Sequence, residues 1–279
     1  MSFSRRRRIG IVGFGHLGQY LVQAILEKQQ EFELAFVWNR TKSYLAGKVD
    51  PSLQLDDLSN FTDKHPDLVV EVAHPSITAE FGKLFVRHCD YMIGSPTVLA
   101  DKNTEISLRE AATQYGIYIA NGALWGGEDI RKMADHGTLK GLKVTMSKHP
   151  SCLKLVGELQ SKNEQVKDHA VILYQGSVRD LCPKAPNNVN TMAAAAIAGY
   201  TLGFDNTQAC LISDPSLADY HIVEVEVQGP IQPDGKKFLV QTVRKNPAPM
   251  GAVTGTATYV SFLSSMLEAR GKGSGFHLC

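Results

Sequence analysis

The chain has 279 residues, of which 43% are hydrophobic and 20% charged, a balance typical of a globular enzyme with a sizeable core. Its 29 basic and 28 acidic side chains nearly cancel, which argues against a nucleic-acid-binding protein. No apolar stretch approaches the roughly 18–20 residues of a membrane span, and the basic run Arg5–Arg8 is expected to be a solvated lead-in to a strand rather than a targeting signal.

The first part of the chain alternates between strand and helix patterns. Apolar runs bounded by turn residues predict strands, and the 3.6-residue periodicity between them predicts helices. Strands are expected at residues 8–12, 32–39, 67–73, 91–95 and 116–123, and helices at residues 17–28, 77–88 and 105–115. Because strands joined through helices form parallel sheets, residues 1–135 are expected to form a Rossmann dinucleotide-binding domain.

The second part of the chain is dominated by strands. They are expected at residues 142–148, 170–178, 209–214, 220–229 and 236–245, with one helix of small residues at 191–203. Mainly antiparallel strands with few helices predict an α+β domain over residues 136–254. A last helix, near residues 255–268, is expected to pack back on the first domain within the segment 255–279. The fold class is therefore α/β, with a Rossmann domain followed by an α+β domain.

A glycine motif joins the first strand to the first helix. In "GFGHLG", Gly13 permits a tight turn, Gly15 lets a pyrophosphate approach the backbone, and Gly18 lets the helix pack on the sheet. The helix N-terminus then offers free N–H groups to the phosphates. The strand before the motif and the helix after it favour dinucleotide binding over a ligand-free turn.

The end of the second strand discriminates between cofactors. An acidic residue there would hold the ribose of NAD, but this chain has Asn39 and Arg40. Arg40 is suited to stack on adenine or to pair with a 2′-phosphate, and Asn39 to bind a ribose hydroxyl. NADP is therefore expected to be accepted, alongside NAD. The alternative is that Arg40 is an ordinary solvated loop residue.

Three stretches of the later sequence are candidates for the chemistry. They are "ANGALWGGEDI" at residues 120–130, "KAPNNVNTMAAAA" at 184–196 and "SDPSLADYHIVEVEVQG" at 213–229. Each also has a structural interpretation. The first is compatible with a plain turn, Asn188 or Asn190 with a helix cap, and His221 with a half-buried strand histidine.

Taken together, these stretches resemble the L-aspartate dehydrogenase family. The resemblance covers nearly the whole chain and rests on "GFGHLG", "VVEVAHP", "GALWGGEDI", "APNNVNTMAAAA" and "DPSLADYHIVEVEV". It implies a Rossmann domain with an α/β substrate and dimerisation domain, in a cytoplasmic homodimer. The implied reaction is the NAD(P)-dependent oxidation of L-aspartate to iminoaspartate, and then to oxaloacetate and ammonia.

The resemblance also assigns site residues. His221 matches the catalytic histidine, which is expected to take a proton from the substrate amine and to assist water attack on the imine, with a pKa near neutral. The expected cofactor site comprises Gly13, Gly15, His16, Leu17, Gly18, Asn39, Arg40, Ala73, His74, Ala123, Asn188 and Asn190.

Two positions depart from the family pattern. The phenylalanine that precedes the asparagine motif is Ala185, and the arginine of the microbial T-R-K-P-P pattern is Ser147. If that arginine holds a substrate carboxylate, its loss bears on specificity for aspartate. Lys148 keeps the family's lysine and is a candidate partner for a substrate carboxylate. The alternative for Lys148 is a solvated lysine at the end of a strand.

Other readings of function stay open from sequence. One is a related reductase acting on an imine or aldehyde of another small dicarboxylate, and another is a catalytically weak NADP-binding regulatory protein. The five cysteines are scattered and odd in number, which predicts reduced thiols. The nine histidines do not cluster with cysteines or acids, so no metal site is expected.

Overall fold

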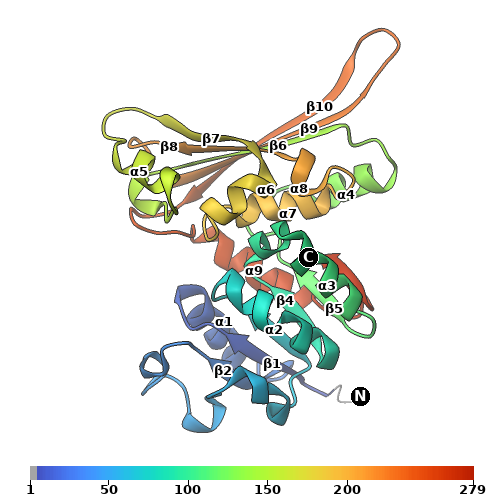
Figure 1. The fold of residues 1–279 in the computed structure, drawn as a ribbon. Helices are drawn as coiled ribbons and strands as arrows, with labels where there is room; N and C mark the ends of the chain where they lie inside the picture. The colour runs from blue at the N-terminus through green and yellow to red at the C-terminus, as the bar shows by residue number, and fades with distance from the viewer. Residues whose placement is uncertain (1–4) are drawn as a thin grey trace.

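A computed structural model describes residues 5–279, so the first four residues of the expected Rossmann domain lie outside the described part. A six-stranded sheet forms the lower half of the molecule in Figure 1, in the order β11-β5-β4-β3-β1-β2. Every neighbouring pair in it is parallel. Its strands are β1 (Arg7–Val12), β2 (Phe32–Trp38), β3 (Leu68–Glu71), β4 (Asp90–Ile93), β5 (Gly116–Ile119) and β11 (Gly275–Leu278).

Helices cover both faces of this sheet because successive strand residues point to opposite sides. On one face, Ile9 and Ile11 of β1 join the core that contains α1 (His16–Glu27) and α9 (Ala257–Glu268). On the other face, Val12 joins the core that contains α2 (Pro75–His88) and α3 (Lys102–Ala111). The short 3-10 segments of this half are Lys42–Tyr44, Pro51–Leu53, Leu58–Lys64 and Pro96–Ala100, the last labelled η4.

A five-stranded sheet forms the upper half, in the order β10-β9-β6-β8-β7. It is mainly antiparallel, as expected, but β6 and β8 run parallel. Its strands are β6 (Gly141–Lys148), β7 (Val171–Ser177), β8 (Gln208–Ser213), β9 (Tyr220–Ile231) and β10 (Lys237–Pro247). Figure 1 shows the hairpin of β9 and β10 extending beyond the other strands.

The helices of this half are short. They are α4 (Gly127–Asp135), α5 (Glu158–Glu164), α6 (Val178–Leu181), α7 (Asn190–Ala198) and α8 (Gly203–Asn206), with 3-10 turns at Pro150–Cys152 and Cys182–Lys184. Every residue of α7 after its first is buried, because this helix lies between β6 and the η4 segment of the lower half. The small side chains of "MAAAA" allow that close approach. The two halves consequently share one continuous core.

The C-terminal strand β11 is a feature that the sequence did not predict. Its four residues pair in parallel with β5, and Cys279 continues the pairing by donating to the carbonyl of Ile119 at 3.0 Å. Just before β11, α9 contacts α1 through the face that carries Phe262 and Met266. The end of the chain therefore completes the sheet of the N-terminal domain.

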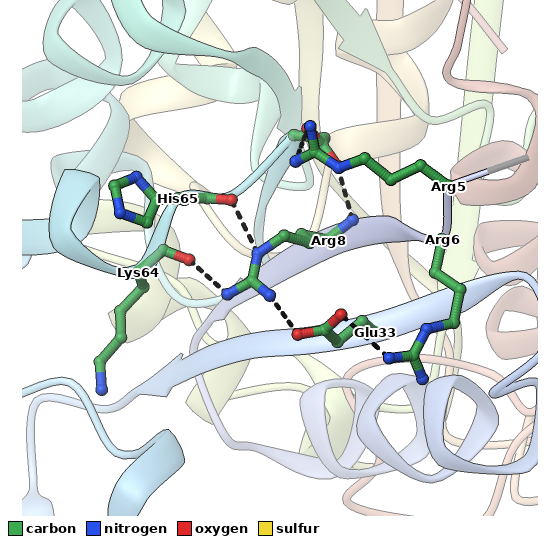
Figure 2. A network of polar contacts seen from close by, with 7 residues as sticks. Arg5, Arg6, Arg8, Glu33, Lys64 and His65 are labelled. Atoms are coloured by element: carbon green, nitrogen blue, oxygen red, sulfur yellow. Dashed lines mark hydrogen bonds and ion pairs between the residues drawn. The ribbon is translucent and has the colours of Figure 1, made fainter.

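The arginine run was expected to be a solvated lead-in to β1, and this holds for Arg5 and Arg6, which are exposed, but is wrong for Arg7 and Arg8, which are half-buried. Figure 2 shows Arg8 between the Glu33 carboxylate and the backbone carbonyls of Lys64 and His65, which accept at 2.8 and 3.0 Å. Arg5, Arg6 and Arg7 pair with Asp67, Glu33 and Asp90. Arg7 and Arg8 were misread because their acidic partners, Asp90 and Glu33, lie on other strands, which only the sheet brings together.

Three further observations concern residues 5–279. No helix among them has the length and apolarity needed to span a membrane. The five cysteines are all free and buried. No three histidine, cysteine or acidic side chains of this part of the chain gather where they could hold a metal ion.

Candidate active site

The glycine turn has the geometry of a phosphate-binding loop. Gly13 has a φ of 112°, which other residues rarely adopt, and a Cβ on Gly18 would lie 2.1 Å from the Gly13 carbonyl oxygen. A Cβ on Gly15 would meet no atom within 4 Å, so the space above this residue is open. No side chain caps α1, which begins at the next residue. The turn therefore offers both room and free N–H groups to a pyrophosphate.

The remaining loop residues of the predicted cofactor site flank this turn. His16 is exposed at the first position of α1, and Ala73 and His74 are exposed between β3 and α2. Since β1 and β3 are neighbours in the sheet, both loops lie at the same carboxyl edge. His74 also has a local task, because its Nδ1 accepts from the Ser76 amide at 3.2 Å and caps α2.

The side chain of Asn39 makes hydrogen bonds within the described part of the chain, whereas that of Arg40 forms no ion pair there. The Asn39 Oδ1 accepts from the Phe14 amide at 3.1 Å, and its Nδ2 donates to the Thr41 carbonyl at 2.9 Å. The Asn39 side chain thus holds the glycine turn against the end of β2. Arg40 is exposed and forms no ion pair with any residue from 5 to 279. Its guanidinium is available to a ligand.

A cleft of about 690 Å³ lies between the two halves of the molecule, at the carboxyl edge of the parallel sheet. The walls come from the ends of β4 and β5, from α9, and from β6, β9 and α7 of the upper half. Six of the residues predicted from sequence line it, namely Leu17, Ala123, Lys148, Asn188, Asn190 and His221.

The cleft also contains most of the unsatisfied polar atoms of the described chain. Four buried side-chain nitrogen or oxygen atoms of residues 5–279 have no hydrogen-bond partner. Three of the four belong to cleft residues, namely the Oδ1 atoms of Asn121 and Asn190 and the Nε2 of His221. Because a buried polar atom without a partner costs free energy, this concentration marks the cleft as a place where a ligand supplies the partners.

His221 is a buried base on β9. Only 4% of the residue is exposed, and burial followed by the charge of Lys148 lowers its pKa to about 4, although the Ala252 backbone opposes this. The near-neutral pKa expected from sequence is therefore wrong for the protein without ligands, because that value belongs to a solvated imidazole. At pH 7 the ring is neutral and its free Nε2 is able to accept a proton.

Lys148 is a buried cation beside His221, and the solvated alternative is wrong. The residue is 3% exposed, and its Nζ donates to the carbonyls of Val253 at 3.1 Å and Asn188 at 3.4 Å. Burial lowers the pKa of the ammonium to about 8, so it is charged at pH 7. No carboxylate of residues 5–279 pairs with it, so its charge lacks a counterion in the cleft.

Ser147, which replaces the arginine of the microbial pattern, does not point into the cleft. Ser147 pairs with Ile222, and alternation along β6 directs its side chain to the opposite face of the sheet from Lys148. An arginine at this position would point away from His221. The absence of an arginine at position 147 therefore removes no carboxylate partner from this cleft.

The two asparagines of the "APNNVN" stretch have different surroundings. Asn188 accepts from the Lys154 amide at 2.7 Å and donates to the Cys152 carbonyl at 2.9 Å, so its side chain supports the neighbouring loop. Asn190 opens α7 but does not cap it, and its Oδ1 stays unpartnered. Ala185, at the position of the family's phenylalanine, is fully buried.

Sequence reasoning missed a carboxylate at the end of β3. Glu71 is fully buried and accepts from the Ala73 amide at 2.6 Å, the Ser95 amide at 3.0 Å and the Ser95 hydroxyl at 3.1 Å. Burial raises the pKa of this carboxyl to about 7. Glu71 thereby fixes the loops after β3 and β4 beside the cleft. The signal was its position in "VVEVA", an acid within a fully apolar strand.

Known proteins resemble this chain along its full length. Residues 129–265 match the family described as aspartate dehydrogenase, C-terminal, and residues 13–121 match the homoserine dehydrogenase NAD binding domain. The aspartate dehydrogenase domain-containing protein of Xenopus tropicalis is 52% identical over 100% of both chains. The chain belongs to the aspartate dehydrogenase family.

More distant members of the aspartate dehydrogenase family agree. The L-aspartate dehydrogenase of Methanococcoides burtonii is 28% identical, with 93% of this chain and 95% of that one covered. The crystal structure of aspartate dehydrogenase from Thermotoga maritima has the same fold, with a TM-score of 0.68 at 18% identity over 96% of this chain and 98% of that one. Together with the glycine turn, the family makes this protein an NAD(P)-dependent oxidoreductase that takes NAD or NADP.

Proposed function

We propose that the protein oxidises L-aspartate to iminoaspartate, which water converts to oxaloacetate and ammonia. The observation that carries this proposal is the pairing of a free neutral base with a cation that lacks a counterion, side by side in the cleft beside the glycine turn. An amino acid needs one group to take a proton from its ammonium and another to bind its carboxylate. Relatives called L-aspartate dehydrogenase support the choice of substrate.

His221 performs the proton transfers in this proposal. Its neutral ring takes a proton from the substrate ammonium, since only the free amine can become an imine. The anionic substrate favours the imidazolium that results, because it offsets the charge of Lys148. Once the imidazolium has released that proton to solvent, the neutral ring removes a proton from the water that attacks the imine. Its burial keeps bulk water away from the reacting carbon.

Lys148 binds and orients the substrate. Its ammonium exchanges the Val253 and Asn188 carbonyls for a substrate carboxylate, a stronger charge-assisted partner. The chemistry that NAD(P)⁺ supplies when bound is acceptance of a hydride from the α-carbon. Gly15, Asn121 and Asn190 fit that cofactor, because the first leaves space for the pyrophosphate and the other two present free amide oxygens in the cleft.

Arg40 supports acceptance of NADP in particular. Its exposed guanidinium is free of acidic partners in residues 5–279 and lies just after β2, where the adenosine ribose is held in Rossmann domains. We propose that it contacts the 2′-phosphate. A cytoplasmic homodimer also belongs to the proposal, by resemblance to the family. Light scattering of the purified protein checks the oligomeric state, and a monomer would contradict it.

A panel of amino acids tests the function. The protein is incubated with NAD⁺ or NADP⁺ and each amino acid, and cofactor reduction is followed by absorbance. Turnover with L-aspartate above all others is the expected result. Turnover only with another small dicarboxylate substrate would instead favour a related reductase, and tight cofactor binding without any turnover would favour a regulatory protein.

A further inference from the structure

A second cation stands beside the cleft, on the edge strand β10. Arg244 lies opposite Val223 of β9, and Asn246, two residues later, lies opposite His221. Val223, Asn246 and His221 all line the cleft. Alternation along β10 therefore directs the Arg244 side chain to the same face of the sheet as these three residues. Its guanidinium approaches the carbonyl of Gly122, another residue of the cleft wall, at 3.4 Å.

The Arg244 guanidinium has few partners. It is half-buried, and burial lowers its pKa, yet it pairs with no carboxylate among residues 5–279. The Gly122 carbonyl, at a long distance, is its one hydrogen-bond acceptor in that range, although a guanidinium has five N–H donors. The face of β6, β9 and β10 that it shares carries no acidic residue. An anion from outside the protein is the missing partner.

The register of the sheet sets the two cations on either side of the catalytic histidine. Met146 of β6 and Arg244 of β10 both pair with Val223, and continuing the β6 register by one residue places Lys148 opposite His221. Neighbouring strands are about 4.8 Å apart. Lys148 and Arg244 lie on strands that flank β9, displaced from each other by two residues along the strands, and His221 on β9 lies between them. Lys148 is deep in the cleft, whereas Arg244 is at its rim.

We propose that Arg244 binds the side-chain carboxylate of the substrate and so selects a four-carbon dicarboxylate. This inference rests on the proposed function of the same cleft. The α-carboxylate is attached to the reacting carbon and must stay near His221, which suits Lys148. The side-chain carboxylate lies one carbon farther out, toward the rim where Arg244 stands. The planar guanidinium fits a carboxylate with two parallel N–H donors.

The test compares L-aspartate with L-asparagine, which has the same length but a neutral side chain. Arg244→Met is expected to lower kcat/KM for L-aspartate by about ten- to a hundredfold, the size of one charge-assisted contact. Activity with L-asparagine and the affinity for NADPH are expected to stay unchanged. Arg244→Lys is expected to recover only part of the loss, because an ammonium lacks the fork of donors. Lys245→Met is the control, since it removes an exposed charge from the opposite face of the same strand.

Binding of succinate to the NADPH complex, measured by calorimetry, separates this inference from the proposed function. If the wild type turns over L-aspartate and Arg244→Met keeps its preference over L-asparagine, the assignment of Arg244 is overturned while the function stands. If the wild type does not turn over L-aspartate but binds succinate in an Arg244-dependent way, the function fails and the assignment holds. No succinate binding and no turnover by the wild type would overturn both. Melting curves, with Arg244→Gln as a second variant, exclude misfolding as the cause.

Discussion

Polar side chains at the two edges of the parallel sheet differ in whether they have partners within the chain. At the amino edge, each of the four arginines from Arg5 to Arg8 has a carboxylate partner, which comes from a part of the chain that is distant in sequence. At the carboxyl edge, the Nε2 of His221 and the Oδ1 atoms of Asn121 and Asn190 have none, and Lys148 meets only carbonyl groups. The polar side chains named at the amino edge are thus paired within the chain, whereas those named at the carboxyl edge lack a counterion or a hydrogen-bond partner among residues 5–279.

This difference distinguishes groups that hold the fold from groups that wait for a ligand. A charge with partners in its own chain contributes to the stability of the folded state, whereas a buried polar group without them lowers it. Glu71 lies at the carboxyl edge, but like the arginines of the amino edge it has partners within the chain, because three donors bind its carboxylate. Substitutions at the two edges should consequently move stability and activity in different directions.

The largest expected effect is that of Gly15→Val at the carboxyl edge. The valine side chain would occupy the open space above the turn, and NADPH binding should be abolished. The fold should tolerate it, since Gly15 has a φ of −72° and a Cβ there meets no protein atom. Fluorescence titration with NADPH and a melting curve of the same preparation measure both effects. A stable variant that still titrates normally would show that the turn does not bind the cofactor.

His221→Ala should lower aspartate turnover by about 10²–10⁴-fold, the usual contribution of a general acid or base. NADPH affinity should change little, and the melting temperature should fall only modestly, because the substitution leaves a cavity but removes a ring with an unsatisfied nitrogen. The comparison needs the rate and the melting curve of both proteins. Wild-type turnover in a folded variant would remove His221 from the mechanism, whereas lost stability with a normal specific rate would make it a structural residue.

Lys148→Met should weaken succinate binding by about ten- to a hundredfold yet stabilise the protein. The folded-state pKa of Lys148, about 8, lies below its ordinary value of 10.5, so its charged form destabilises the fold at neutral pH. Wild-type stability should therefore rise between about pH 8 and pH 10.5, and this rise should vanish in the variant. The gain at pH 7 is at most roughly 3 kcal/mol.

Succinate titration against pH checks the binding role of Lys148. Wild-type affinity should fall above about pH 8 as the ammonium loses its proton, and the variant should show no such break. Denaturant unfolding at pH 7 and pH 10 measures the stability effect. Equal affinity for succinate in both proteins would exclude Lys148 as a carboxylate partner.

Arg8→Met, at the amino edge, should have the smallest effect, and it should change stability rather than activity. It removes an ion pair with Glu33 and two hydrogen bonds to backbone carbonyls, all partly exposed. The free energy of unfolding should fall by about 1–2 kcal/mol, with kcat and KM unchanged. Urea denaturation and steady-state kinetics measure the two quantities. A clear loss of activity without lost stability would contradict the division between the two edges.

Local patterns in the sequence were sufficient for the alternating elements of the N-terminal half and for the glycine turn. The strands β1, β2 and β6 and the helix α1 were predicted to within about one residue. Their signals are periodicity and glycine spacing, which depend on neighbours in the chain. Resemblance to a family then pointed to His221, Asn190 and Lys148, all of which line the cleft.

Contacts between distant segments decided the rest, and no local pattern encodes them. Strand β11 is four residues long, follows a glycine-rich turn and forms only because the edge of β5 is free to pair with it. The burial of Lys148, the pKa of His221 and the partners of Arg8 depend on which strands become neighbours. The sequence by itself determined the cofactor turn and the candidate base. The tertiary structure decided which charges meet a partner and which are left for a substrate, because pairing requires groups far apart in the chain to come within a few ångströms.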